Sequence, residues 1–379
     1  MKWTVFFVLF LMTLAAPTLA ADEINYTSQP DELVIFLNNI AYARDTISLP
    51  GDVDVRLILP SQIYPDTLIL RENDERIPAY RLTQGADGQI AVQWQSTAQG
   101  EVREVTAEYL LSGVGWAPKY DMWLGDEDAT TVDLDFFAEI RNAALSLDEV
   151  SVRLVAGRVD SSQMLNNIST VTANQYLAGY MSPQTSSGQS LTGEATIQHV
   201  YTLGSVTAEP GEAVYTRLQE STLPARRVFL WNAPSDQQVT AIYKVTNESE
   251  LPFAEGIVRI YQDDLFLGSD FVELTPIGSE GSITVGRLQN VRVNRTETQT
   301  AVEATFGTRS DRDTLHEITL SLSNFGDEAL EIEVVDRYSP LALDFVFGQE
   351  PAREGDNVLR WIATVEPGAT VDIRYEYKD

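Results

Sequence analysis

The chain has 379 residues and no cysteine, and its 56 acidic side chains outnumber 26 lysines and arginines. This length is typical of two or three domains with sizeable cores. A formal net charge of −30 repels phosphate backbones and anionic lipid headgroups, which excludes nucleic acid as a partner. Without cysteine there is no disulfide framework, so ordinary apolar cores must hold the chain together.

The first twenty residues are typical of an export signal. Lys2 precedes an apolar run over residues 5–14, and small residues follow it, with Ala20 as the expected cleavage site. An uncleaved anchor is the alternative, although the run is shorter than the roughly 20 residues that a membrane span needs. We therefore expect an exported protein, periplasmic, at the cell surface or extracellular, with no membrane span in the mature chain.

Short stretches of alternating apolar and polar residues, separated by turn residues, recur along the chain and predict β-strands. No stretch keeps a period near 3.6 residues over three helical turns, so little helix is expected. The fold class is all-β, with tandem β-sandwich modules. The expected domains after the signal (1–20) are an N-terminal β module (21–107), a central β-sandwich (108–300) and a C-terminal immunoglobulin-like sandwich (301–379).

Within the first module, residues 33–44 predict two strands joined at Asn38-Asn39, and further short strands are expected at 67–70, 79–82 and 90–94. Pro-Gly pairs punctuate the chain at Pro50-Gly51, Pro210-Gly211 and Pro367-Gly368. Each pair suits a turn that leads into a half-buried strand. Three such turns indicate three β modules.

The stretch 109–124, YLLSGVGWAPKYDMWL, is the expected centre of the chain. We interpret it as an apolar strand, a corner at Trp116-Ala117-Pro118, and a second strand that carries Tyr120 and Trp123. Aromatic rings at such a corner usually fill the end of a sandwich. The alternative for Trp116, Tyr120 and Trp123 is an exposed platform on which sugar rings stack. Trp94, Trp231 and Trp361 are expected in cores.

Residues 161–193 contain no charged side chain, in contrast to the rest of this acidic chain. One interpretation is a flexible excursion between two strands of the central module. The other is an adhesive loop that approaches a partner without desolvating charge, and its candidate interaction residues are Tyr176, Leu177, Tyr180 and Met181.

The C-terminal module shows the clearest alternation. His316, Ile318, Leu320 and Leu322 share one face of a predicted strand, and residues 370–378 alternate in the same way after Pro367-Gly368. About seven short strands in this module are typical of an immunoglobulin-like or fibronectin-like sandwich.

Two stretches resemble one known family. YLLSGVGWAPKY at 109–120 and the run LWNAP at 230–234 followed by residues 245–286 are similar to the domain-of-unknown-function family 4139, found in proteins similar to mucoidy inhibitor A. The similarity extends from about Ala107 to the C-terminus. The family implies a β-rich exported or envelope-associated protein and supplies no catalytic residues. Many relatives carry a coiled coil before this domain, whereas residues 94–106 lead directly into it here.

Residues that could carry chemistry are few. His199 and His316 are the only histidines, and no G-x-S-x-G elbow precedes either. His316, on an apolar strand face, is interpreted as a packed core histidine rather than a general base. Carboxylate groups at Asp263-Asp264, at 126–128 and at Asp133 with Asp135 could serve glycoside hydrolysis or bind calcium weakly, but they also suit turns and exposed strand faces. No cofactor is expected.

Four Asn-x-Ser/Thr sequons are candidate glycosylation sites: Asn25, Asn167, Asn247 and Asn294. The sequence as a whole favours a secreted or cell-envelope structural or interaction protein without catalytic activity. Its partner would be an envelope or extracellular protein, or a second copy of the chain, docking on a sheet edge or on residues 161–193. The alternatives are a carbohydrate-binding module at Trp116, Tyr120 and Trp123, and a carboxylate-dependent envelope hydrolase.

Overall fold

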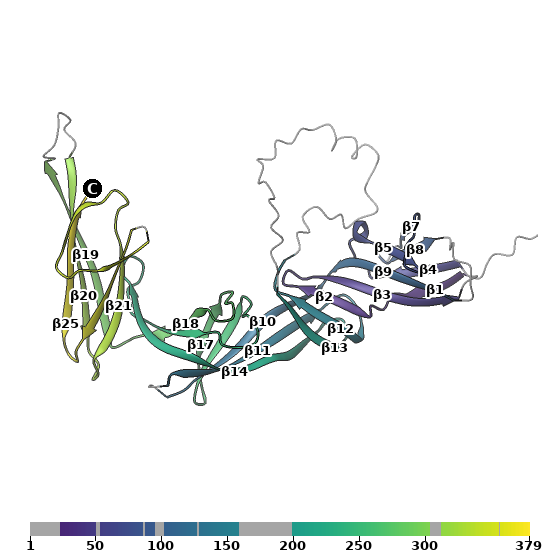
Figure 1. Cartoon of the computed structure of the whole chain (residues 1–379), viewed down its shortest axis with the longest axis horizontal. Coiled ribbons are helices and arrows are strands. Elements are labelled where there is room, and N and C mark those ends of the chain that lie inside the picture. The colour runs from purple at the N-terminus through teal and green to yellow at the C-terminus, as the bar shows by residue number, and fades with distance from the viewer. Residues whose placement is uncertain are drawn as a thin grey trace, which may run out of the picture. The chain divides into compact units, whose positions relative to one another are not determined.

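The computed structural model in Figure 1 describes residues 23–50, 54–85, 88–94, 102–126, 129–158, 199–303, 312–355 and 357–379. Regular structure in these ranges is almost entirely β-strand, which confirms the all-β prediction; the helix among them is the single 3-10 turn η1 (Pro65–Thr67). The expected signal, Gly51, Asn167 and residues 161–193 lie outside the described ranges. So do Tyr176, Leu177, Tyr180 and Met181.

Two compact units make up the described chain. Of the described residues, those within 23–115, 142–158 and 204–212 form the first unit, and those within 116–141, 199–203 and 213–379 form the second. The predicted central module therefore does not stay together. The strand at 147–155, which falls within the predicted range 108–300, pairs in parallel with the strand at 32–36 of the first unit, and its buried residues largely alternate along the strand.

The first unit contains two sheets (Figure 1), and alternate residues of the longer strands are buried. The predicted hairpin at 33–44 is present, with Asn39 at φ 61° in its turn. The seven-stranded sheet has the order β13 (Val200–Ala208), β12 (Leu147–Val155), β2 (Glu32–Phe36), β3 (Ile40–Pro50), β9 (Val102–Ser112), β5 (Ile69–Glu72) and β6 (Glu75–Arg76). The four-stranded sheet has the order β1 (Glu23–Thr27), β4 (Asp54–Leu59), β8 (Ile90–Trp94) and β7 (Arg81–Gln84).

The largest sheet belongs mainly to the second unit. Its hydrogen-bonded path is β17 (Leu265–Val272), β16 (Gly256–Gln262), β10 (Val114–Leu124), β11 (Thr131–Asn142), β14 (Glu212–Asn232), β21 (Leu330–Arg337), β24 (Val358–Val365) and β23 (Ala352–Glu354). Two further strands, β15 (Thr240–Thr246) and β18 (Glu280–Arg287), branch from β14. The 21-residue strand β14 can serve several neighbours because different parts of its length pair with β15 and β21.

The C-terminal residues form a sandwich around one core. Its second sheet has the order β19 (Val291–Glu303), β20 (Arg312–Asn324), β25 (Thr370–Lys378) and β22 (Leu343–Phe347). The buried residues of this sheet include His316, Ile318 and Tyr377. The core cluster also takes Trp231 and Val239 together with Trp361. The sandwich therefore begins before residue 301, because β19 starts at Val291 and packs its apolar side chains into this core. The core positions predicted for Trp94, Trp231 and Trp361 are confirmed.

Three buried asparagines repeat one hydrogen-bond arrangement at strand ends. Asn142, Asn247 and Asn324 are 2%, 0% and 1% exposed. The Nδ2 of each donates to a carbonyl three or four residues later and to a carbonyl in a more distant segment, at Ala208, Thr275 and Val365 respectively. Each Oδ1 accepts from the backbone N–H two residues later.

The backbone carbonyl of each of these asparagines also accepts a hydrogen bond from a glycine in a turn. The backbone oxygens of Asn142, Asn247 and Asn324 accept from the N–H groups of Gly211, Gly278 and Gly368, at 2.7, 2.7 and 2.9 Å. All three glycines have positive φ, which glycine adopts without strain. We call each arrangement an asparagine clamp. The predicted turns at Pro210-Gly211 and Pro367-Gly368 belong to clamps, and the third clamp uses Pro276-Ile277-Gly278.

The expected corner at Trp116-Ala117-Pro118 is wrong. The chain turns at Gly113, with φ +91°, and β10 then continues through Pro118 to Leu124. Proline is tolerated in this strand because the parallel pairing with β16 begins one residue later, at Lys119 with Ile257. Gly256 allows the approach, since an added Cβ would lie 2.5 Å from the Pro118 oxygen.

Candidate functional site

The side chains of β10 alternate between the interior and the solvent. Trp116 and Tyr120 point inward and are 3% and 0% exposed, whereas Trp123 lies on the other side of the strand and is 38% exposed. Trp116 packs edge-on against Tyr201, and the Tyr120 hydroxyl donates to the Ala254 oxygen at 2.8 Å. The first two rings therefore fill the core, and the three do not form one platform.

Trp123 instead belongs to an exposed face made by three neighbouring strands. Side chains that pair across β17, β16 and β10 lie in rows on one side of the sheet. We call this surface the aromatic face; its apolar members are Trp123, Ile257, Tyr261, Phe266 and Phe271. Ile257, Phe266 and Phe271 are 45%, 54% and 51% exposed. An exposed apolar surface of this kind is typical of an interaction site.

The aromatic rings of this face contact one another. Tyr261 lies between its neighbours, with its ring centroid 5.6 Å from that of Trp123 and 5.5 Å from that of Phe266. At the other end of the strands, Phe271 pairs with Ile257, which pairs with Lys119. The face thus has an aromatic row and a shorter apolar row.

An ion pair lies between the two rows. Arg259 donates to both carboxylate oxygens of Asp121, at 2.6 and 2.7 Å. This two-pronged contact satisfies both groups, and the hydrogen bond to Asp121 together with its charge raises the pKa of Arg259. The centre of the aromatic face consequently presents a charge pair that is already neutralised.

A polar network bounds the face on the β11 side. Glu139 accepts from Arg141, lies 3.4 Å from the Lys119 ammonium, and accepts from the Tyr215 hydroxyl. The hydrogen bond from Arg141 is the largest influence on Glu139 and lowers its pKa, with Tyr215 and Lys119 acting in the same direction. This network therefore separates the aromatic face from the strands that follow β11 in the sheet.

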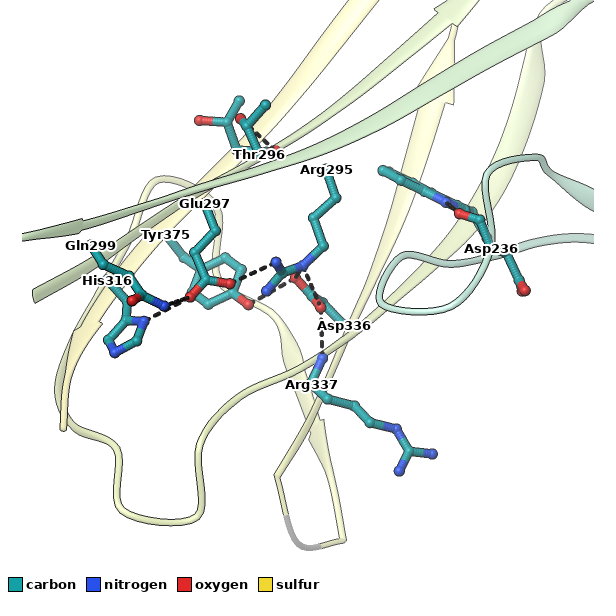
Figure 2. Close-up of polar contacts among 11 residues, drawn as sticks. Asp236, Arg295, Thr296, Glu297, Gln299, His316, Asp336, Arg337 and Tyr375 are labelled. Atoms are coloured by element: carbon teal, nitrogen blue, oxygen red, sulfur yellow. Dashed lines mark hydrogen bonds and ion pairs between the residues drawn. The ribbon is translucent and has the colours of Figure 1, made fainter. Parts of the chain in front are cut away.

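A second polar cluster lies inside the C-terminal sandwich (Figure 2). Asp336 on β21 is fully buried, and both of its oxygens accept from Arg295 Nε on β19, at 3.1 and 3.0 Å. The Tyr375 hydroxyl donates to the same carboxylate at 2.8 Å. Burial raises the pKa of Asp336, although Arg295 and Tyr375 act against that rise. The cluster joins the two sheets of the sandwich.

His316 closes the other end of this cluster. Its Nδ1 contacts Glu297 at 2.8 Å and its Nε2 contacts Asp379 at 2.9 Å, so both ring nitrogens are occupied. Burial by itself lowers the pKa of His316, but the two carboxylates outweigh burial and raise it. Burial would raise the pKa of Glu297, yet hydrogen bonds from Gln299, Arg295 and His316 bring it to about 2. The ring also stacks on Tyr377, in line with its interpretation as a packed histidine.

The remaining candidates for chemistry lie apart. His199 contacts the Tyr201 ring, and burial lowers the pKa of His199. Asp263 and Asp264 are exposed in the β16–β17 turn. Asp133 accepts from Thr222, and Asp135 pairs with Arg217; residues 127 and 128 lie outside the described ranges. Within the described residues, no group of three or more His, Asp or Glu side chains could hold a metal ion.

The described sequons differ in access. Asn25 and Asn294 are exposed on strands, whereas the side chain of Asn247 is locked in an asparagine clamp. Of the aromatic face, sequence reasoning found only Trp123. The spacing of Ile257, Arg259 and Tyr261 indicated that they share one side of a strand. It did not indicate whether that side is buried or exposed. Nothing in the sequence paired Arg295 with Asp336.

Comparisons with known proteins identify one family. The model of the family described as Domain of unknown function (DUF4139) matches residues 105–378, well over half of the chain. No curated protein and no solved structure matches the chain. No helix in the described ranges has the length and apolar character that a membrane span requires.

Proposed function

We propose that this chain, which belongs to the DUF4139 family, is an exported interaction protein of the cell envelope or exterior, without catalytic activity, and that it docks a protein partner on the aromatic face. The observation that carries the proposal is this face itself. Aromatic side chains and arginine are enriched at protein interfaces, and Trp123, Tyr261, Phe266 and Arg259 bring these residue types together.

The position of the face at the end of a sheet supports the same function. β17 is the last strand of the hydrogen-bonded path. A terminal strand can pair with an extended segment of a partner through main-chain hydrogen bonds. Export is inferred from the N-terminal sequence, with Lys2 followed by an apolar run and small residues.

The geometry of the polar side chains favours binding over catalysis. Both nitrogens of His316 already contact carboxylates, so the ring has no free position for proton transfer with a substrate. Arg259 and Asp121 likewise satisfy each other. What remains on the aromatic face is apolar contact surface.

Affinity capture from the native cell surface tests the proposal. The double variant Phe266→Ser/Ile257→Thr removes two exposed apolar side chains from the aromatic face. Phe325→Ser/Ile362→Thr is the matched control, because it makes the same replacements at side chains that are 66% and 57% exposed elsewhere. We expect the first variant to lose partners that the control retains, with unchanged circular dichroism in both. Equal capture by both variants would refute the docking role.

A glycan is the second candidate ligand, favoured by the near-parallel rings of Trp123 and Tyr261, whose planes differ by 20°. Flat aromatic rings can pack on the apolar faces of sugars. Trp123→Ala should then abolish binding on a glycan array, whereas Trp116→Ala, in the core, should act only through folding.

A further inference from the structure

The ends of the aromatic face carry carboxylates. Asp263 and Asp264 occupy the β16–β17 turn next to Tyr261 and Phe266, and Asp126 follows β10. At the opposite end, Glu255 precedes β16 and Glu273 follows β17. All five are exposed, and none of them has an ion-pair partner among the described residues: Asp126, Glu255, Asp263, Asp264 and Glu273.

The cations of this region are already engaged. Lys119 pairs with Glu139, and Arg259 pairs with Asp121. An approaching surface therefore meets unpaired negative charge at both ends of the face and a neutralised pair at its centre. Charge complementarity requires positive groups on the partner, spaced to either side of an apolar strip.

A second copy of the chain does not meet this requirement. Two such faces would bring like carboxylates together, and each chain carries a formal net charge of −30. Repulsion of this kind opposes association and keeps the apolar surface available. An anionic partner is disfavoured for the same reason.

On the premise of the proposed function, we infer that the aromatic face binds a cationic amphipathic segment of a protein partner. Its apolar side chains cover Trp123, Tyr261 and Phe266 and the pair Ile257 and Phe271. Its lysine or arginine side chains meet the carboxylates at the two ends. Apolar burial supplies most of the affinity, and the charges determine which partners are accepted.

Calorimetric titration of the full chain with three synthetic peptides tests the inference. The first has leucine on one helical face and lysine on the other, the second replaces lysine by glutamate, and the third replaces leucine by serine. We expect the Leu/Lys peptide to bind about tenfold or more tightly than either other peptide, and its affinity to fall severalfold as salt rises from about 0.05 M to about 0.5 M.

Two pairs of variants locate the binding. Phe266→Ser/Ile257→Thr should weaken the Leu/Lys peptide about tenfold, and Phe325→Ser/Ile362→Thr should leave it unchanged. Asp263→Asn/Asp264→Asn should weaken it severalfold and reduce its salt dependence. Asp327→Asn/Glu328→Gln is the matched control, an exposed acidic pair in another turn.

The outcomes separate this inference from the proposed function. If the captured partner depends on Phe266 and Ile257 but the Leu/Glu peptide binds as well as the Leu/Lys peptide, the cationic partner is wrong and the docking face stands. Equal binding of the Lys/Ser peptide would show attraction to net charge alone and would also overturn the inference. If neither capture nor peptide binding responds to Phe266→Ser/Ile257→Thr, the docking face itself is refuted.

Discussion

The Nδ1 atom of His316 lies 2.8 Å from a carboxylate oxygen of Glu297. The other ring nitrogen contacts Asp379, and two carboxylate acceptors require a proton on each nitrogen. The doubly protonated imidazolium is therefore the form of the ring that donates to both carboxylates, in line with the raised pKa of His316. It ties β20 to β19 and to the end of the chain, with Tyr377 stacked on it and Arg295 holding Glu297 from the other side.

His316→Gln should remove a pH-dependent part of the stability. The pKa of folded His316 lies above its ordinary value of 6.5, so its stabilising effect is complete below that value and is lost as the pH rises through the folded pKa. Urea unfolding should show that the unfolding free energy of the wild type exceeds that of the variant by about 1–3 kcal/mol near pH 6. That advantage should shrink toward pH 9. A constant difference across this range would contradict the imidazolium assignment.

Arg295→Met should destabilise the C-terminal sandwich strongly. It leaves Asp336, which is fully buried, without its cationic partner. Breaking one side of a buried ion pair costs about 3–5 kcal/mol, which urea unfolding can measure. Arg337→Met is the control, since the neighbouring Arg337 is exposed and contacts Asp336 only through its backbone N–H. Equal losses in the two variants would rule out the pair as a structural tie.

Asp45→Asn should change the pH dependence of the first unit. Asp45 is 1% exposed and accepts from Ser28 and from the backbone of Gln29, and burial raises its pKa to about 6. A raised folded pKa contributes stability that is present below the ordinary value of 3.8 and is lost as the pH rises through about 6.

Relative to the wild type, Asp45→Asn should therefore gain about 2–3 kcal/mol of unfolding free energy between pH 4 and pH 7. Thermal unfolding across this range checks the gain. Asp74→Asn replaces a residue in an exposed turn and is the control: its unfolding free energy should change with pH as that of the wild type does. If the unfolding free energy of Asp45→Asn also follows the wild type across this pH range, burial does not raise the pKa of Asp45.

Asn247→Ala should be costly, although residue 247 starts a sequon. Its side-chain Nδ2 donates to two carbonyl oxygens and its Oδ1 accepts from the backbone N–H of Ser249 in the interior. Removing the amide leaves these buried backbone groups without partners, which costs about 2–4 kcal/mol. Asn294→Ala, at an exposed sequon on β19, should change the unfolding free energy by about 0.5 kcal/mol or less. Comparable losses at both sites would argue against the clamp.

The same contrast predicts where a glycan can be attached. In a host that glycosylates sequons, peptide mass spectrometry should find modification at Asn25 or Asn294 and none at Asn247. The buried amide of Asn247 is inaccessible in the folded chain. A glycan at Asn247 in folded protein would show that the clamp is open when the chain meets the transferase.

Alternation by itself determined much of this protein. Residues 33–44 and 370–378 showed their strands and their buried sides, and Pro210-Gly211 and Pro367-Gly368 marked turns, because a strand places successive side chains on opposite faces and few residues accept the turn conformation. The spacing also contained a clue that the platform interpretation overlooked. Trp116 and Tyr120 are an even number of residues apart, but Trp123 is an odd number from both, so one continuous strand must place it on the opposite face.

Only the tertiary structure decided what lies beside what. Trp123 meets Tyr261 because β10 pairs in parallel with β16, a contact between segments more than a hundred residues apart. Phe266 joins them through Tyr261, its partner on β17. Arg295 meets Asp336 across two sheets, and β12 joins β2 rather than the predicted central module. Periodicity reports which side of a strand is apolar; it carries no information about which strand will be its neighbour, because that choice depends on packing between distant parts of the chain.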